Sequence, residues 1–191
     1  MGNGLISKDN KGELQIEVDV EKDFILDTGI EKIWTHKGLK CCVIANPLGH
    51  RCGYVGVEKS NKFYGIYFDQ PITFKGQEIT IEYLVSVHGG ITFSGEGKWI
   101  DGLVEDLWYF GYDTAHGGDG KDVSIMSKKA KELHESFVKR IEEREYFLFK
   151  GIYDGEIRTL EYCTEECESL AEQLNVMESF VLTKSQALMP E

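Results

Sequence analysis

The glycines of this chain are concentrated in its middle, and this limits the folds open to it more than any other feature. Fifteen of the 21 glycines lie between residues 38 and 120. Short runs of β-branched and aromatic residues separate them, as in strands joined by tight turns. We expect strands over residues 32–35, 39–45, 53–57, 79–87, 90–94 and 107–112. The pattern predicts a central, mostly antiparallel sheet.

The segment before this region has a pattern of its own. Apolar residues alternate there with polar ones, at Leu14, Ile16, Val18 and Val20. A period of two is typical of a half-buried strand. We therefore expect residues 1–30 to form an N-terminal extension or an edge strand.

After Gly120 the apolar residues take the spacing of helices. Ser127 is placed to cap a first, highly charged helix, over residues 127–143, whose apolar positions are Ala130, Leu133, Phe137 and Ile141. Thr159 is placed to cap a second helix, with an apolar stripe of Leu160, Cys163, Cys167, Leu170 and Leu174. Aromatic residues at 146–152 suggest one more strand. The sequence predicts an α+β fold with the C-terminal helices packed on the sheet, one domain over residues 31–183, and a flexible tail at 184–191.

Composition restricts the function classes. With 33 acidic and 21 basic residues the net charge is −12, so long nucleic acids would be repelled and general nucleic-acid binding is not expected. No apolar run is long enough for a membrane span, and the first residues lack the features of a secretory signal. The five cysteines are an odd number in a chain of this size, which favours reduced thiols over a disulfide framework. We expect a cytoplasmic protein.

Three histidines stand where predicted strands meet glycine-bearing turns. They lie in the segments PLGHRCG (residues 47–53), HGG (88–90) and YDTAHGGD (112–119). Loops held by a rigid sheet commonly present binding groups. The first hypothesis is a site for a small phosphate-bearing, nucleotide-like ligand, because glycine-rich turns leave backbone amides open to anions. Its candidate residues are His50, Arg51, His88, Gly89, Gly90, Asp113, His116, Gly117, Gly118 and Asp119, with Lys98 or Lys121 as further cations. The alternative is that these glycines only form hairpin turns.

A second hypothesis is a divalent metal ion held by His88, Asp113, His116 and Asp119, with a position open for water. No standard zinc-binding spacing is present, and the alternative is that the aspartates make hydrogen bonds within their turns. A third hypothesis is a nucleophilic Cys52 beside His50, which would share one side of an extended strand. Cysteines in apolar surroundings are more often inert.

With these residues laid out, the chain resembles a family of short uncharacterised proteins encoded by tailed bacteriophages and prophages. The resemblance rests on WTHKGL (34–39), GHRCGYVGV (49–57), HGGITF (88–93) and WYFGYDTAHGGD (108–119), and on the end of the last predicted helix. Tyr112 stands where the family usually has Phe, and residues 1–30 and the charged helix are longer than in relatives. The resemblance implies an accessory role in an infected bacterial host cell, and it brings no particular activity with it.

Together these observations favour a phage-encoded accessory protein that binds a nucleotide-like molecule between the two histidine loops. Sequestering a signal made by a bacterial defence system would suit such a protein, and turnover is not required. For catalysis, the candidates are His88, His116 and Asp113. The alternative function is a metal-dependent hydrolase of the phosphoesterase kind. In a third interpretation the motifs are structural and the function lies on the surface of a homo-oligomer.

Overall fold

The computed structural model describes residues 6–8, 14–16, 29–143 and 155–180. The strand expected over residues 146–152 and the tail expected at 184–191 lie outside these ranges. Most of the expected N-terminal extension lies outside them too, apart from a short antiparallel pair, β1 (Ile6–Lys8) and β2 (Leu14–Ile16).

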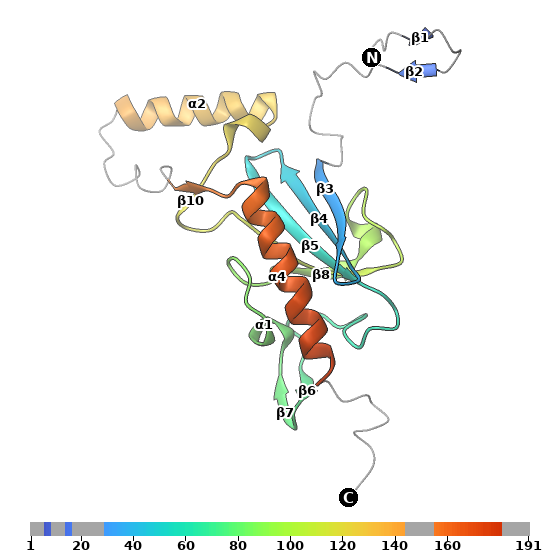
Figure 1. The fold of residues 1–191 in the computed structure, drawn as a ribbon. Helices are drawn as coiled ribbons and strands as arrows, with labels where there is room; N and C mark the ends of the chain where they lie inside the picture. The colour runs from blue at the N-terminus through green and yellow to red at the C-terminus, as the bar shows by residue number, and fades with distance from the viewer. Residues whose placement is uncertain (1–5, 9–13, 17–28, 144–154, 181–191) are drawn as a thin grey trace, which may run out of the picture.

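A five-stranded antiparallel sheet forms the centre of the molecule (Figure 1). Its order is β3-β4-β5-β9-β8, and every neighbouring pair runs antiparallel. The strands are β3 (Ile30–His36), β4 (Leu39–Asn46), β5 (His50–Val57), β8 (Phe93–Glu96) and β9 (Trp108–Asp113). This confirms the predicted sheet.

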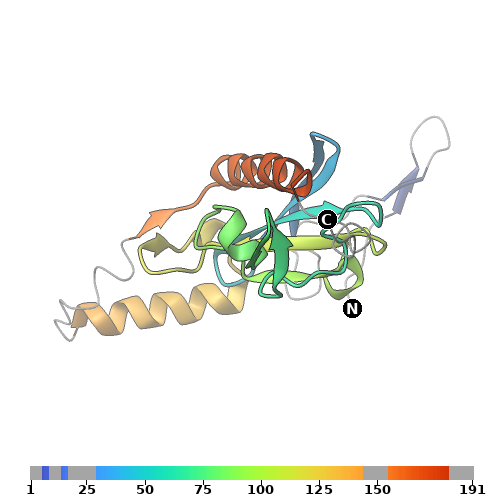
Figure 2. The ribbon, with the colours of Figure 1, turned by 90° about the horizontal axis from the view of Figure 1, so that it is seen from below.

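Helix α4 (Leu160–Glu178) covers one face of the sheet (Figure 2). Its stripe of Cys163, Cys167, Leu170, Ala171 and Leu174 is fully buried. The stripe packs in one cluster with sheet residues that include Cys41, Val43, Val55, Phe110 and Tyr112. Thr159 caps the helix as expected, since its hydroxyl oxygen accepts a hydrogen bond from the Tyr162 amide at 3.1 Å. The α+β class and the packing of a C-terminal helix on the sheet are therefore confirmed.

A smaller core fills the other face of the sheet. Cys42 and Tyr109 are buried there beneath Leu103, which belongs to the segment between β8 and β9. That segment includes a short 3-10 helix, η1 (Gly97–Trp99). The sheet is thus covered on both faces, by a helix on one side and by an irregular segment on the other.

Glycines inside β5 and β9 are explained by tyrosines on the neighbouring strand. Gly53 lies opposite Tyr112, and Gly111 lies opposite Tyr54. A Cβ atom on Gly53 would stand 2.3 Å from the Tyr112 ring, and one on Gly111 would stand 2.6 Å from the Tyr54 ring. Each aromatic ring therefore lies over a glycine across the strand boundary, an arrangement that protects an otherwise weak strand position.

One predicted strand is wrong. Residues 79–87 do not form a strand, because their first residue ends a short hairpin of β6 (Ile72–Phe74) and β7 (Gln77–Ile79), and a helical turn, α1 (Ile81–Leu84), follows at once. The hairpin turns at Lys75 and Gly76, both with positive φ, as a type I′ turn requires. Strand β6, the partner of β7, is only three residues long, so the pairing ends at Ile79.

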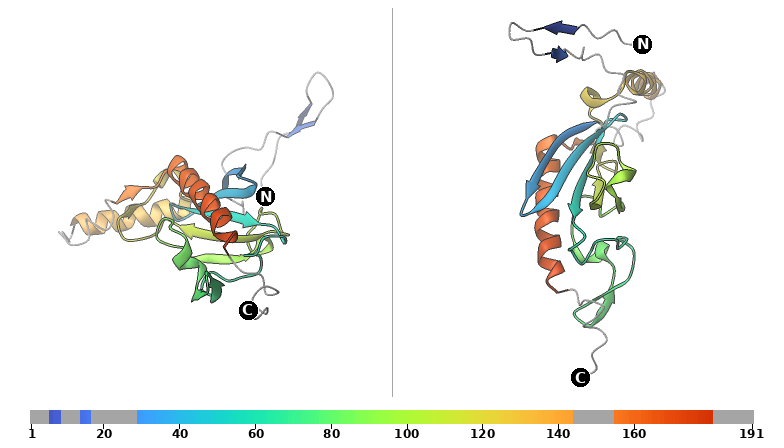
Figure 3. Two further views of the ribbon diagram at one scale, coloured as in Figure 1. Left: turned by 60° about the horizontal axis from the view of Figure 1, so that its bottom comes forward. Right: turned by 90° about the vertical axis from the view of Figure 1, so that its right-hand side faces the viewer.

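The charged helix is α2 (Lys128–Glu143), which follows a 3-10 turn, η2 (Val123–Ile125). The Ser127 hydroxyl accepts a hydrogen bond from the Ala130 amide at 3.2 Å, so the predicted cap is confirmed. Helix α2 lies beyond the end of the sheet (Figure 3), and Leu133 on its apolar side is 62% exposed. Two short strands, β10 (Asp119–Gly120) and β11 (Glu156–Ile157), pair in parallel between the helices.

No helix within the described ranges is both long and apolar enough to cross a lipid bilayer.

Candidate functional site

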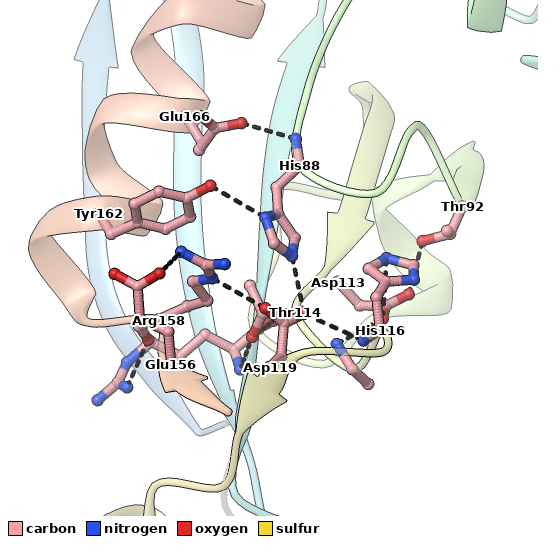
Figure 4. Close-up of polar contacts among 12 residues, drawn as sticks. His88, Thr92, Asp113, Thr114, His116, Asp119, Glu156, Arg158, Tyr162 and Glu166 are labelled. Carbon is pink, nitrogen blue, oxygen red and sulfur yellow. Dashed lines mark hydrogen bonds and ion pairs between the residues drawn. The ribbon is translucent and has the colours of Figure 1, made fainter. Parts of the chain in front are cut away.

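The ends of three neighbouring strands lie at one end of the sheet and bring the histidine motifs together. Strand β9 ends at Asp113, which lies opposite Cys52 near the start of β5. Strand β8 starts nearby, with Phe93 opposite Gly111. The HGG turn precedes β8 and the YDTAHGGD loop follows β9, so both loops lie at this end of the sheet. The first turns of α4 lie over it (Figure 4).

His88 and Asp119 form the buried centre of this site. His88 Nε2 lies 2.8 Å from Asp119 Oδ2, and His88 Nδ1 lies 2.9 Å from the Tyr162 hydroxyl. An ionised carboxylate can only accept, so Nε2 is the nitrogen that carries a proton. Both ring nitrogens of His88 are therefore occupied by partners within the chain.

Asp119 is held as a carboxylate by three donors. Besides His88, Arg158 Nε donates to Oδ1 at 2.8 Å and the His116 amide donates to Oδ2 at 3.1 Å. Its side chain is only 3% exposed. Burial acts to raise the pKa of Asp119, but the hydrogen bonds from Arg158, His88 and His116 outweigh it and lower that pKa below its ordinary value.

The HGG turn is tied to α4 by side chains of the helix. Glu166 accepts a hydrogen bond from the His88 amide at 2.7 Å. Two turns further along, Gln173 accepts from the Ser86 amide at 2.7 Å and donates to the Ser86 carbonyl at 2.8 Å. The segment from Ser86 to His88 is thus fixed against the helix before the turn begins.

His116 packs directly against the HGG turn. Its ring centroid is 5.5 Å from that of His88, and a Cβ on Gly89 would stand 1.8 Å from His116 Nε2. Only glycine fits at position 89, which also has a φ of +66°. The His116 side chain is 35% exposed, yet its Nε2 atom is buried and has no hydrogen-bond partner among the residues that the structure describes.

Asp113 is a second neighbour of His116. Its Oδ2 accepts a hydrogen bond from the Thr92 hydroxyl at 2.9 Å, and its Oδ1 accepts one from the Ala115 amide at 3.0 Å. His116 Nε2 is 3.7 Å from Oδ1, too far for a hydrogen bond. The Asp113 side chain is 28% exposed, so this carboxylate is open to solvent where Asp119 is not.

Arg51 has a structural position. It forms a two-pronged ion pair with Glu31, at 2.6 and 3.0 Å, and also donates to Asp122 and to the Arg158 carbonyl. The residue is 6% exposed. Arg51 therefore joins the start of β3, η2 and the segment before α4, and its geometry does not favour the ligand contact expected from the sequence.

His50 lies on the sheet face turned away from α4, two residues before Cys52, which pairs with Asp113. Its Nδ1 atom is buried, and no described part of the chain offers it a hydrogen-bond partner. Burial and the charge of Lys121 lower the pKa of His50, and the charge of Asp113 acts against them. The Asp122 amide donates to the Gly49 carbonyl at 2.8 Å and Cys52 pairs with Asp113, so the backbone brings Lys121 and Asp113 near the segment that carries His50.

The remaining glycines of the two loops are open. No atom lies within 4 Å of a Cβ placed on Gly90, Gly117 or Gly118. Of the two candidate lysines, Lys98 forms an ion pair with Glu96, the last residue of β8. This is the end of the strand away from the site. Lys121, beside His50, is the one that lies near the site.

The set proposed for a metal ion is brought together but is not arranged as ligands. Across the described parts of the chain, no group of three or more His, Cys, Asp or Glu side chains is placed to hold a metal ion. His88 has no free nitrogen, and Asp119 and Asp113 both accept hydrogen bonds on each of their oxygens. A metal at His88 would have to displace Tyr162 or Asp119, so His88 is not placed as a metal ligand.

Cys52 is not activated. Burial, with a smaller effect of the Asp113 charge, raises the pKa of this thiol to about 11. A thiol with that pKa contains almost no thiolate at neutral pH. The nucleophilic cysteine is therefore disfavoured by its surroundings.

Four residues of the site were not among the sequence candidates: Thr92, Arg158, Tyr162 and Glu166. Arg158 reaches Asp119 because β11 pairs in parallel with β10. No local sequence pattern predicts this strand pairing. Tyr162 and Glu166 lie on α4 four residues apart, which places them on one helix face. This helical spacing can be recognised in the sequence, but the sequence does not show which loop the helix face contacts.

Comparisons with models of protein families, with curated proteins and with solved structures found no match to this chain. The resemblance to the phage family remains a prediction from the motifs, and the function is argued from the site alone.

Proposed function

We propose that this chain binds a small nucleotide-like molecule at the surface formed by the HGG turn and the YDTAHGGD loop. The observation that carries the proposal is the contrast between the two histidines. His88 is fully hydrogen-bonded within the chain, whereas His116, 5.5 Å away, is partly exposed and has an unpartnered Nε2. A buried polar atom without a partner costs about 1–3 kcal/mol, which a ligand that supplies the partner recovers.

The buried network gives this surface a fixed shape. Asp119 connects the YDTAHGGD loop to His88 and to Arg158, and Glu166 connects the HGG turn to α4. Preformed sites lose less entropy when a ligand binds. In this proposal His88 and Asp119 are positioning residues, and His116, Asp113 and the glycine amides meet the ligand.

The charges around the site indicate how a nucleotide would lie. Asp113, Asp119, Glu156 and Glu166 bring four carboxylates, and Arg158 is already paired with two of them. The sugar or base, which has hydrogen-bond donors, suits the Asp113 side. The phosphate suits the amides of Gly117 and Gly118 and the nearby charge of Lys121. A long polyanion does not suit a chain with a net charge of −12.

In the cell, binding without turnover would act by sequestration. We place this role in a phage-infected bacterium because of the resemblance that its motifs predict to phage proteins. Removal of a nucleotide signal made by a host defence is the form of this role that the proposal favours.

Calorimetric titration with AMP, GMP, CMP, UMP and NAD tests the binding. We expect saturable binding of at least one of them, weakened tenfold or more in His116→Ala and unchanged in His36→Ala. His36 is a suitable control because it lies on β3 and contacts Glu172 of α4 at 3.0 Å, outside the two loops. Equal affinities in the two variants, or no saturable binding by any probe, would overturn the proposal.

Elemental analysis of protein purified without added metal separates binding from metal-dependent hydrolysis. We expect no stoichiometric divalent ion, and native mass spectrometry to show any ligand retained intact. One divalent ion per chain that disappears in His116→Ala would contradict the proposal and favour the hydrolase.

A further inference from the structure

Three polar groups around the end of β9 have hydrogen-bonding capacity that the described chain does not use. They are the carboxylate of Asp113, Nε2 of His116 and Nδ1 of His50. Each carboxylate oxygen of Asp113 accepts one hydrogen bond from the chain. Since a carboxylate has about four acceptor positions, roughly two remain.

His116 and Asp113 are neighbours, and His50 lies on the same sheet face as Asp113. His116 Nε2 is 3.7 Å from Asp113 Oδ1. His50 shares the sheet face of Cys52, which pairs with Asp113 across the strands, and the charge of Asp113 acts on the His50 imidazole. One carboxylate with about two free acceptor positions therefore has an unpartnered ring nitrogen 3.7 Å away, at His116, and a second imidazole, His50, within the range of its charge.

This inventory matches two neighbouring hydroxyl groups. A hydroxyl donates one hydrogen bond and accepts others, so each can donate to Asp113 while it exchanges a hydrogen bond with one imidazole nitrogen. A phosphate cannot donate to the carboxylate at neutral pH and would be repelled by it. A single hydroxyl would leave one buried nitrogen without a partner.

We infer that Asp113, His116 and His50 form a subsite for a vicinal diol, such as the 2′- and 3′-hydroxyls of a ribose. The inference rests on the proposed function, because it assigns the sugar of the nucleotide-like ligand to one end of the same surface. The subsite makes the chain selective for ribonucleotides over deoxyribonucleotides. The open space around Gly117 and Gly118 leaves room for the loop to admit the sugar.

Separate titrations of the unmodified chain with AMP, 2′-deoxy-AMP and 3′-deoxy-AMP test this selectivity. GMP, CMP and UMP are each compared with their deoxy forms in the same way. We expect loss of either hydroxyl to weaken binding roughly ten- to a hundredfold, as for a hydrogen bond to a charged group. Equal affinities for the ribose and deoxyribose forms would overturn the diol subsite and leave the proposed function standing. If no nucleotide binds, both the diol subsite and the proposed function are contradicted.

The variant Asp113→Asn assigns the selectivity to this carboxylate. An asparagine oxygen can still accept from the Ala115 amide, and its NH₂ group can donate to Thr92, so the loop keeps its internal bonds. We expect the ratio of ribose to deoxyribose affinity to fall towards one, with a nearly unchanged melting temperature. The control is Asp106→Asn, which removes a carboxylate that is 90% exposed near Lys59 and should keep the full ratio. A ratio unchanged in Asp113→Asn would contradict the assignment, and if that variant does not fold, the comparison in the unmodified chain decides.

Discussion

Asp113 and Asp119 begin and end one loop, yet the fold gives them different roles. Asp119 is buried and accepts from His88, Arg158 and the His116 amide. Asp113 is partly exposed and, within the described ranges, accepts from the Ala115 amide of its own loop and from Thr92. The sequence placed both aspartates in one motif, as candidates for ligand binding and for metal binding alike. The difference comes from His88 and Arg158, whose side chains donate to Asp119.

The lowered pKa of Asp119 predicts a loss of stability in acid. Because its folded-state pKa lies below the ordinary value of 3.8, the folded state binds fewer protons than the unfolded state between the two values. Its contribution is fully present above pH 3.8 and is lost as the pH falls through the lowered pKa. Urea midpoints from pH 6 to pH 2.5 should therefore fall less steeply in Asp119→Asn than in the unmodified chain. The Asp106→Asn control should keep the original slope, and equal slopes in all three proteins would contradict this role of Asp119.

The two glycines of the HGG turn give a matched pair of substitutions. Both have positive φ, so alanine at either position costs about 1–2 kcal/mol of backbone strain. Only at Gly89 would the new methyl group also meet His116, 1.8 Å from Nε2, whereas Gly90 faces open space. We expect Gly89→Ala to unfold at a lower urea concentration than Gly90→Ala and to weaken nucleotide binding as strongly as His116→Ala does. Similar stability and affinity in the two variants would show that His116 does not pack on this turn in solution.

Among the elements, those with strong local signals were predicted and those that depend on distant partners were not. Strands β4, β5 and β9 and helix α4 follow from apolar periodicity and from the Thr159 cap, because each buries one face against the same core. The 79–87 segment has an equally regular apolar pattern, but its strand ends where its short partner ends. The β10–β11 pair is set by tertiary contact and has no signature of its own.

Helix α4 has a second task besides covering the sheet, and this predicts a coupling to the site. Gln173 bonds both backbone groups of Ser86, two residues before His88. In Gln173→Ala the two hydrogen bonds are lost, so we expect faster amide hydrogen exchange in residues 85–90 and a stability loss of about 1 kcal/mol. Glu161→Ala, an exposed position on the same helix, is the control. Unchanged exchange in residues 85–90 of Gln173→Ala would mean that α4 does not hold the turn in place.

At the scale of the whole molecule, the sheet is covered on both faces while its polar chemistry gathers at one end. The core under α4 and the smaller core under Leu103 together contain four of the five cysteines. Sequence predicted that Cys163 and Cys167 are core residues, and they are fully buried. It predicted a site between the two histidine loops, but it could not show the antiparallel register of β5, β8 and β9 that brings both loops to one end of the sheet.

This distribution of cysteines provides a test that links the fold to ligand binding. Burial raises the pKa of Cys41 and Cys42 to about 12 and that of Cys52 and Cys163 to about 11, and it raises the pKa of Cys167 as well. We therefore expect a thiol reagent at pH 8 to label the folded chain slowly, at the rate at which unfolding exposes the thiols, and all five cysteines to react at once in urea.

A nucleotide that binds only the folded state must slow this labelling by mass action. At a hundred times its Kd the expected stabilisation is about 2.7 kcal/mol, which is about a hundredfold lower rate when labelling requires global unfolding. The protection should disappear in His116→Ala and persist in His36→Ala. Fast labelling of the folded chain would show that the two cores open without global unfolding. Slow labelling that is insensitive to a nucleotide shown by calorimetry to bind would place the binding outside the folded body described here.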